Sequence, residues 1–153
     1  MPSTSEPFST RPLEKEDVLF VLSLSKARIQ DSHLDEKGIE EYLHEDFLKG
    51  ILLLDGEEKA GYCLYRQSDY DGEIDEIAIL KKEEGKGAGT FLLQKALDLL
   101  DDGRRREVFL EAREGNTRAR KLYESLSFEG YRRRVNYYGN EDSICYRKEL
   151  GRK

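Results

Sequence analysis

Three glycines at alternate positions, Gly85, Gly87 and Gly89, stand between two apolar stretches and could bind an anion. Glycine has no Cβ, so such a turn can adopt positive φ and point its backbone N–H groups toward a bound group. A helix that begins at about Gly89 would add unpaired N–H donors and the positive end of its dipole. We therefore expect the ligand of this turn to carry phosphate.

Two well-known phosphate-binding motifs do not fit the spacing of this turn. A P-loop has four residues between its glycines and then Gly-Lys-Ser/Thr, whereas Gly85 and Gly89 are four positions apart and Thr90-Phe91 follows. A dinucleotide fingerprint has Gly-x-Gly-x-x-Gly near the first strand of an alternating fold, and this turn comes after half the chain. Taken alone, the glycines could also form a turn that only joins a strand to a helix.

Hydrophobic periodicity predicts the elements that must hold this turn in place. We expect helices over 13–29, 35–48, 90–100 and 117–126, and strands over 8–12, 51–54, 60–65, 73–80, 107–111, 131–138 and 143–148. Gly50 is predicted to end the second helix. The order β-α-α-β-β-β-α-β-α-β-β predicts an α/β (α+β) fold, in which a mixed sheet has helices packed on its faces.

Length and charge limit the possible functions. A chain of 153 residues fits a single domain over 1–153. Residues 1–103 carry 12 Lys or Arg and 24 Asp or Glu, a net charge of −12, while residues 104–153 carry 14 and 8, a net charge of +6. This split could hold an anionic cofactor near one half and attract a cationic substrate to the other, although a solvated surface explains it equally well. The overall charge of −6 argues against general nucleic-acid binding.

The cysteines, the histidines and the first residues argue against a disulfide-linked, metal-binding or secreted protein. Cys63 and Cys145 each lie in an apolar run, so we expect buried reduced thiols rather than a disulfide. The spacing around His33 and His44 predicts no metal site. The N-terminus lacks the basic start and apolar block of a signal peptide, and no run reaches the ~20 apolar residues of a membrane span. We therefore expect a cytoplasmic protein that does not enter a membrane.

The segment 110–128, together with the glycine turn, resembles the GCN5-related N-acetyltransferase (GNAT) superfamily. In that superfamily Arg/Gln-x-x-Gly-x-Gly/Ala cradles the pyrophosphate of acetyl-CoA, and Glu84-Gly-Lys-Gly-Ala-Gly89 occupies this motif. The pattern Asn116-x-x-Ala119-x-x-x-Tyr123, followed by Leu126-x-Phe128, resembles the second cofactor segment. The residues from Arg134 to Ser143 are most similar to the RimI-type branch, which acetylates protein N-terminal amines, including that of a ribosomal protein.

The resemblance implies a GNAT-type acyl-CoA N-acyltransferase fold with acetyl-CoA as the cofactor. The cofactor-binding residues that it implies are Ile77, Ala78, Ile79, Glu84, Gly85, Lys86, Gly87, Ala88, Gly89, Thr90, Asn116 and Tyr123. Glu84 departs from the family's Gln or Arg, and its carboxylate should repel pyrophosphate unless nearby lysines offset it. Asn116 could instead only cap its helix. Ser127 stands where the family has Gly, so we expect a strained turn there.

Acetyl transfer to an amine needs a base that removes a proton from the ammonium group and an acid that protonates the departing thiolate. The resemblance implies that Glu111 is the base, acting through water, and that Tyr123 is the acid, since a phenol with a reference pKa of about 10 stays protonated. It also implies that Tyr137 and Tyr138 bind the peptide substrate. Without the resemblance, these would be a strand-end carboxylate, a residue covering the core edge and an aromatic pair that stabilises a hairpin.

Three functions follow from these residues. The first is an acetyl-CoA-dependent N-acetyltransferase whose amine substrate is a protein or peptide N-terminal α-amine, attacked directly in a ternary complex. The second is an acetyltransferase for a small amine, such as a polyamine or an amino sugar. The third is an acyl-CoA-binding module that has lost turnover, which the carboxylate at Glu84 suggests.

Overall fold

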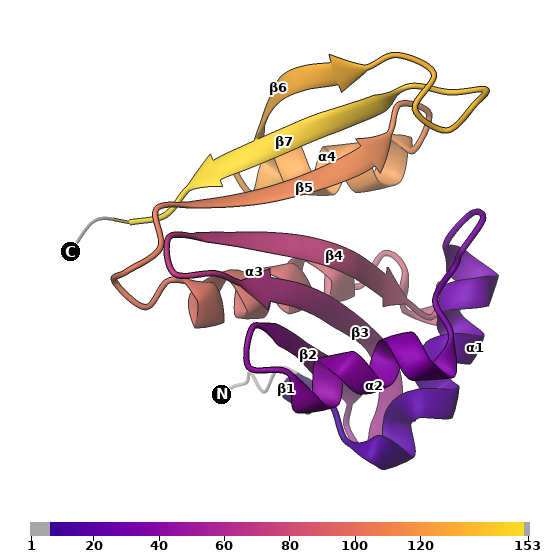
Figure 1. Ribbon diagram of the computed structural model, residues 1–153. Helices are drawn as coiled ribbons and strands as arrows, with labels where there is room; N and C mark the ends of the chain where they lie inside the picture. Colours follow the sequence, from indigo (N-terminus) through magenta and orange to yellow (C-terminus); the bar gives the residue numbers. More distant parts are fainter. Residues whose placement is uncertain (1–6, 152–153) are drawn as a thin grey trace.

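The computed structural model describes residues 7–151, which form a seven-stranded sheet with helices on both faces (Figure 1). The strands are β1 (Phe8–Pro12), β2 (Leu48–Asp55), β3 (Glu58–Gln67), β4 (Asp71–Ile79), β5 (Glu107–Arg113), β6 (Glu129–Arg134) and β7 (Ser143–Glu149). The α-helices are α1 (Val18–Arg28), α2 (Glu36–His44), α3 (Ala88–Leu100) and α4 (Thr117–Ser125), and η1 (Lys15–Asp17) and η2 (Lys81–Glu83) are short 3-10 helices. The predicted element order and fold class are confirmed.

Several predicted element boundaries are wrong. Helix α2 ends at His44, and Gly50 lies inside β2 rather than at a helix end. Glycine is needed there for close packing, because an added Cβ would lie 2.3 Å from Cδ1 of Leu13. Strand β6 ends at Arg134, so Tyr137 and Tyr138 lie in the β6–β7 loop and not in a strand.

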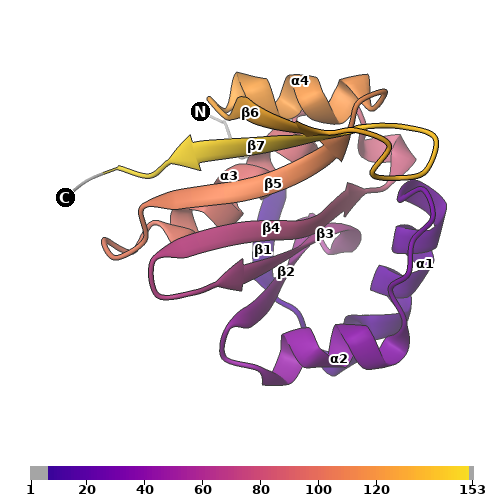
Figure 2. The same ribbon diagram turned by 45° about the horizontal axis from the view of Figure 1, so that its top comes forward.

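The strands follow the order β1-β2-β3-β4-β5-β7-β6, in which every neighbouring pair is antiparallel except the parallel pair β4 and β5. Helices α1 and α2 cover one face of the sheet, and α3 and α4 cover the other (Figures 1 and 2). Burial alternates accordingly along β3, where Tyr62 and Leu64 face α1 and α2 while Cys63 and Tyr65 face α3.

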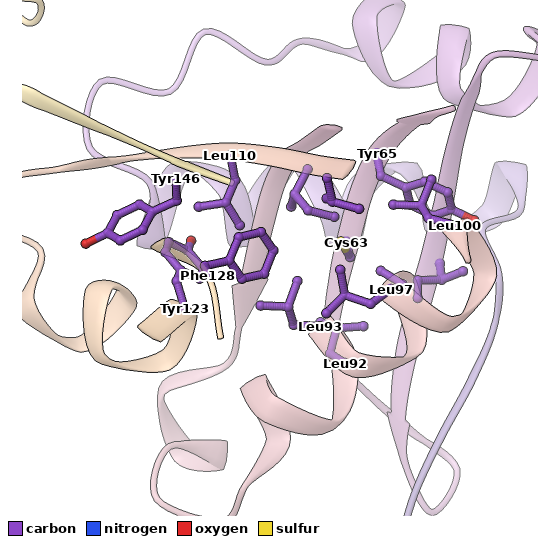
Figure 3. Close-up of a cluster of buried hydrophobic side chains, with 14 of the residues drawn as sticks. Cys63, Tyr65, Leu92, Leu93, Leu97, Leu100, Leu110, Tyr123, Phe128 and Tyr146 are labelled. Atoms are coloured by element: carbon purple, nitrogen blue, oxygen red, sulfur yellow. The ribbon is translucent and has the colours of Figure 1, made fainter. Parts of the chain in front are cut away.

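Two apolar cores fix the helices to the sheet. The larger one lies under α3 and α4, where Leu92, Leu93 and Leu100 are completely buried against the strands (Figure 3). The smaller one lies under α1 and α2 and is centred on Val21 and Ile39. Burial of each such side chain contributes about 1.5–3 kcal/mol. Both cysteines are buried free thiols, as predicted.

Strands β4 and β5 pair only near their beginnings. Their parallel register covers three residue pairs, ends with Glu73 opposite Phe109, and is followed by a separation of the two strands (Figure 1). A β-bulge in β4 lies two residues further on, since Asp75 has no partner in the register with β3. A bulge bends its strand and increases the local twist. It therefore helps to direct the second half of β4 away from β5.

Candidate active site

The glycine turn leads from η2 to the start of helix α3 and presents unpaired backbone donors. Gly85 and Gly87 have φ of 81° and 82°, in the left-handed region that favours glycine, whereas Gly89 lies within the first turn of α3. Within residues 7–151, the backbone N–H groups of 85–90 donate to no protein acceptor. Together with the positive end of the α3 dipole, these donors suit a phosphate-bearing ligand.

The turn forms one end of a cleft of about 1140 Å³ that lies where β4 and β5 separate. Strands β4 and β5, the N-terminal end of α3 and helix α4 form its walls. The predicted site residues that line it are Ile77, Ala78, Ile79, Glu84, Gly85, Gly87, Ala88, Gly89, Thr90, Glu111, Asn116, Tyr123 and Tyr138. The structure thus places the predicted cofactor turn, base and acid in the walls of the same cleft.

Two predicted site residues do not line this cleft. The Nζ atom of Lys86 lies 3.4 Å from Oε1 of the buried Glu83, and Lys86 borders a separate surface hollow next to Phe8. Tyr137 is 54% exposed, and its ring packs edge-on against Tyr138 with 5.0 Å between the centroids. Sequence pattern alone does not distinguish these outward-facing residues from their cleft-lining neighbours.

The carboxylate of Glu84 is paired with two arginines. Arg28, the last residue of α1, forms an ion pair and a hydrogen bond with Oε2 of Glu84, and Nε of Arg118 in α4 lies 3.4 Å from the same oxygen. Neither partner was predicted, because both arginines lie far from Glu84 along the chain, Arg28 by 56 residues. Both arginines also line the cleft, so the local charge beside the turn is net positive.

Glu111 lies on the exposed face of β5, with a side chain 32% exposed. The buried hydroxyl of Ser143 donates a hydrogen bond of 2.6 Å to Oε2 of Glu111. The Nε atom of Arg134 lies 3.6 Å from the same oxygen. Ser143 was part of the recognised segment but had no predicted role. Its place at the start of β7, beside the end of β5, brings its hydroxyl to the carboxylate.

Tyr123 projects from α4 into the wall of the cleft. Its ring makes edge-on contacts with Phe128 and Tyr146, with centroids 6.1 and 5.8 Å away (Figure 3). Burial, and to a lesser extent the neighbouring Cys63, raises the pKa of Tyr123 above that of a free phenol. Its hydroxyl makes no hydrogen bond within residues 7–151. A protonated phenol is therefore available to a group in the cleft.

Two further predictions concern the ends of helix α4. The side chain of Asn116 accepts a hydrogen bond of 3.2 Å from the backbone N–H of Ala119, so it caps this helix. The cap does not prevent Asn116 from also lining the cleft. Ser127, just beyond the other end, has φ of 71°, which is the strained conformation that its replacement of glycine predicted.

The opposite rim of the cleft carries polar residues that the sequence did not single out. Oδ2 of Asp75, in the β4 bulge, accepts hydrogen bonds from the hydroxyl of Tyr42 and from Nε of Arg66. Arg113 lies 3.1 Å from Asp31 of the α1–α2 loop and stacks 3.9 Å above the ring centre of Tyr138. It therefore links the two loops that flank this end of the cleft.

No group of three or more His, Cys, Asp or Glu side chains within residues 7–151 is arranged to hold a metal ion. No helix in the same range is long and apolar enough to cross a membrane.

The glycine turn and both proposed catalytic residues lie within a segment that matches a known family. Residues 17–128 match the Acetyltransferase (GNAT) family, and the chain belongs to this family. The resemblance predicted from the sequence is thereby confirmed.

Curated relatives are acetyltransferases of protein N-termini. N-alpha-acetyltransferase 30 of Schizosaccharomyces pombe is 35% identical over 77 residues, which cover 50% of this chain and 51% of the relative. The [ribosomal protein bS18]-alanine N-acetyltransferase of Haemophilus influenzae is 31% identical over 104 residues, or 63% of this chain and 70% of the relative. The match to N-alpha-acetyltransferase 30 of Xenopus laevis covers only 25% of that relative. The chain thus spans about half or less of the length of the N-alpha-acetyltransferase 30 relatives.

Solved structures share the fold over nearly the whole chain. The ribosomal-protein-S18-alanine N-acetyltransferase from Escherichia coli superposes with a TM-score of 0.84 at 23% identity, covering 95% of this chain and 96% of the other. A chain of the NatC complex bound to Gag peptide and CoA also gives 0.84, at 18% identity, covering 95% and 100%. These similarities establish the GNAT fold.

Proposed function

We propose that this protein transfers the acetyl group of acetyl-CoA to the N-terminal α-amine of a protein or peptide. The observation that carries the proposal is the cleft itself, which joins the free N–H groups of the glycine turn to Glu111 and Tyr123. An anion-binding end and a proton-transferring end in one cavity are what an acyl transfer from a phosphate-bearing carrier requires.

The residues of the turn fit the carrier. The backbone N–H groups of 85–90 would hold the pyrophosphate, and Arg28 and Arg118 offset the charge of Glu84 beside it. The edge of β4 that is not paired with β5, formed by Ile77, Ala78 and Ile79, would border the rest of the carrier. When bound, acetyl-CoA supplies an activated acetyl thioester.

Glu111 and Tyr123 would perform the two proton transfers. Glu111 accepts a proton from the substrate ammonium group, through water, and leaves a nitrogen lone pair that can attack the acetyl carbon. As the new C–N bond forms and the C–S bond breaks, Tyr123 donates its phenol proton to the departing sulfur, and the second proton that the nitrogen loses restores the phenol. The pKa of Tyr123 is raised mainly by burial, so the phenol is protonated at neutral pH and can act as the acid.

Two considerations favour an N-terminal α-amine as the acceptor. An α-amine has a reference pKa near 8, well below that of lysine, so a carboxylate can deprotonate it more easily. The relatives from Schizosaccharomyces pombe and Haemophilus influenzae are named for acetylation of such amines. Tyr138, which stacks on Arg113 at the rim, and the exposed Tyr137 would contact the first residues of the peptide.

A substrate panel tests the proposal directly. Thiol release from acetyl-CoA would be measured with peptides of different N-terminal residues, with the same peptides carrying blocked α-amines, and with polyamines and amino sugars. We expect turnover only with free α-amines. Turnover confined to the small amines would replace the proposed substrate, and acetyl-CoA binding without turnover in either panel would identify a binding module.

Replacement of Tyr123 by phenylalanine tests the proposed acid. Tyr123→Phe should lower kcat roughly 10²–10⁴-fold and change acetyl-CoA affinity little, because only the proton donor is lost. Tyr70→Phe, at a position that is 68% exposed and outside the cleft lining, provides the control. Undiminished turnover in Tyr123→Phe would remove this residue from the mechanism.

A further inference from the structure

We propose that Ser143 is a positioning residue for the base: its hydroxyl holds one oxygen of Glu111 and leaves Oε1 as the basic atom. The inference rests on the proposed function, in which Glu111 accepts the proton of the substrate amine. It extends that function by naming the group that orients this carboxylate.

The β5–β7 ladder fixes the geometry of this contact. Ser143 is the first residue of β7 and pairs with Arg113, while Glu111 pairs with Cys145 two positions along. The two side chains are therefore diagonal neighbours on one face of an antiparallel pair. The Ser143 hydroxyl donates to Oε2 of Glu111 at 2.6 Å, and Ser143 is completely buried. Its hydroxyl is thus held in place by the sheet.

The two carboxylate oxygens of Glu111 have different surroundings. Oε2 accepts the hydrogen bond from Ser143 and also lies 3.6 Å from Nε of Arg134 on β6. Oε1 has no hydrogen-bond or ion-pair partner within residues 7–151. Since Glu111 lines the cleft, the unoccupied oxygen is the one left to receive a proton.

Other ionisable side chains interact electrostatically with Glu111. Glu73 of β4 has a raised pKa, for which burial is the main cause and the charges of Asp75 and Glu111 are lesser ones. Burial is the main cause of the raised pKa values of Tyr131 and Tyr138, to which Glu111 also contributes, and Cys145 is the partner of Glu111 in the β5–β7 register. The like charges of Glu73 and Glu111 repel each other, whereas Ser143 offers Glu111 a hydrogen-bond donor.

The hydroxyl should affect both the charge and the direction of the carboxylate. A hydrogen bond donated to the charged form favours that form over the protonated acid. A fixed Oε2 also limits rotation of the carboxylate, so that Oε1 stays directed at one position. Removal of the hydroxyl would therefore reduce the fraction of enzyme that carries a correctly aimed base.

Titration of Ser143→Ala tests the contact without relying on turnover. The carboxyl carbon of Glu111 would be followed by ¹³C NMR against pH and assigned by its loss in Glu111→Gln. In Ser143→Ala we expect the midpoint of this titration to rise by about 0.5–1 pH unit, as loss of one charge-assisted hydrogen bond predicts. At neutral pH, kcat should fall about 5- to 20-fold, with less than a twofold change in acetyl-CoA affinity.

Two further variants complete the experiment. Ser143→Thr retains the hydroxyl and should restore the midpoint and most of kcat. Ser68→Ala removes a hydroxyl that donates to a backbone carbonyl in the β3–β4 turn, and it should change neither quantity. An unchanged midpoint in Ser143→Ala would overturn the inference. If the wild type acetylates no amine, the proposed function fails, and the titration still decides whether Ser143 holds the carboxylate.

Discussion

At the scale of single residues, Glu84 shows how partners change the meaning of a departure from a family pattern. Alone, a carboxylate at the start of a pyrophosphate-binding turn should weaken binding. Here Arg28 and Arg118 approach the same oxygen, and the Glu84 side chain is only 19% exposed. The three side chains together carry one net positive charge. Repulsion by Glu84 should therefore appear only when an arginine is removed.

A double-mutant cycle tests this interpretation. Arg28→Met should weaken acetyl-CoA binding by about 3- to 10-fold, on the order of 1 kcal/mol for a partly exposed pair. Adding Glu84→Gln to Arg28→Met should recover most of the loss, because the unpaired carboxylate is then gone. Calorimetric titration measures both effects, with Lys26→Met on the exposed side of α1 as the control. Equal affinity of Arg28→Met and wild type would contradict the argument.

At the scale of elements, Asp17 anchors the start of the first helical layer to the sheet. This carboxylate in η1 is 1% exposed and lies 2.8 Å from Arg11 of β1 and 2.7 Å from Lys59 of β3. Burial alone would raise the pKa of Asp17, but hydrogen bonds from Arg11, Lys59 and the Glu14 backbone outweigh it and lower the pKa to about 2 from 3.8. The charged form therefore stabilises the fold.

The lowered pKa of Asp17 gives a pH-dependent prediction. Its contribution, about 2 kcal/mol, is fully present above pH 4 and is lost as the pH falls from about 4 to about 2. Asp17→Asn should lower the free energy of unfolding by roughly 2–4 kcal/mol at pH 7, since two cations lose their partner. The difference from wild type should shrink below pH 4. Urea unfolding at several pH values measures it, with the exposed Glu16→Gln as control. A difference that stays constant down to pH 2 would count against the pairing.

At the scale of the whole molecule, the cleft coincides with the charge boundary in the chain. Strands β1–β4 and helices α1–α3 lie within residues 1–103, which carry the net charge of −12, and β5–β7 and α4 lie within the part that carries +6. Ion pairs bridge this boundary, including Arg118 with Glu84 and Arg113 with Asp31. Because the two parts of the chain carry opposite net charge, the two walls of the site attract each other.

Sequence patterns predicted the features that depend on neighbouring residues. Periodicity predicted the element order, and the family resemblance assigned Glu111 and Tyr123 to one site; both residues line the cleft. Gly50 was misread because a helix end and a close packing contact both favour glycine. The pairings of Glu84 with Arg28 and of Ser143 with Glu111 join residues that are 56 and 32 positions apart. The first contact depends on how α1 packs beside the glycine turn, and the second on the pairing of β5 with β7; both join elements that are distant along the chain.

The short parallel ladder between β4 and β5 has a consequence for amide hydrogen exchange. Beyond Glu73, one edge of β4 pairs with β3 while the other faces the cleft. Successive N–H groups of a strand point to opposite sides, so amides between Ile74 and Ile79 should divide into slowly and rapidly exchanging sets. Acetyl-CoA should slow the rapid set only, as residue-resolved exchange by NMR can measure. Uniform protection of these amides in the free protein would mean that the cleft edge is not open. One strand would thus report both the intactness of the sheet and the occupancy of the site.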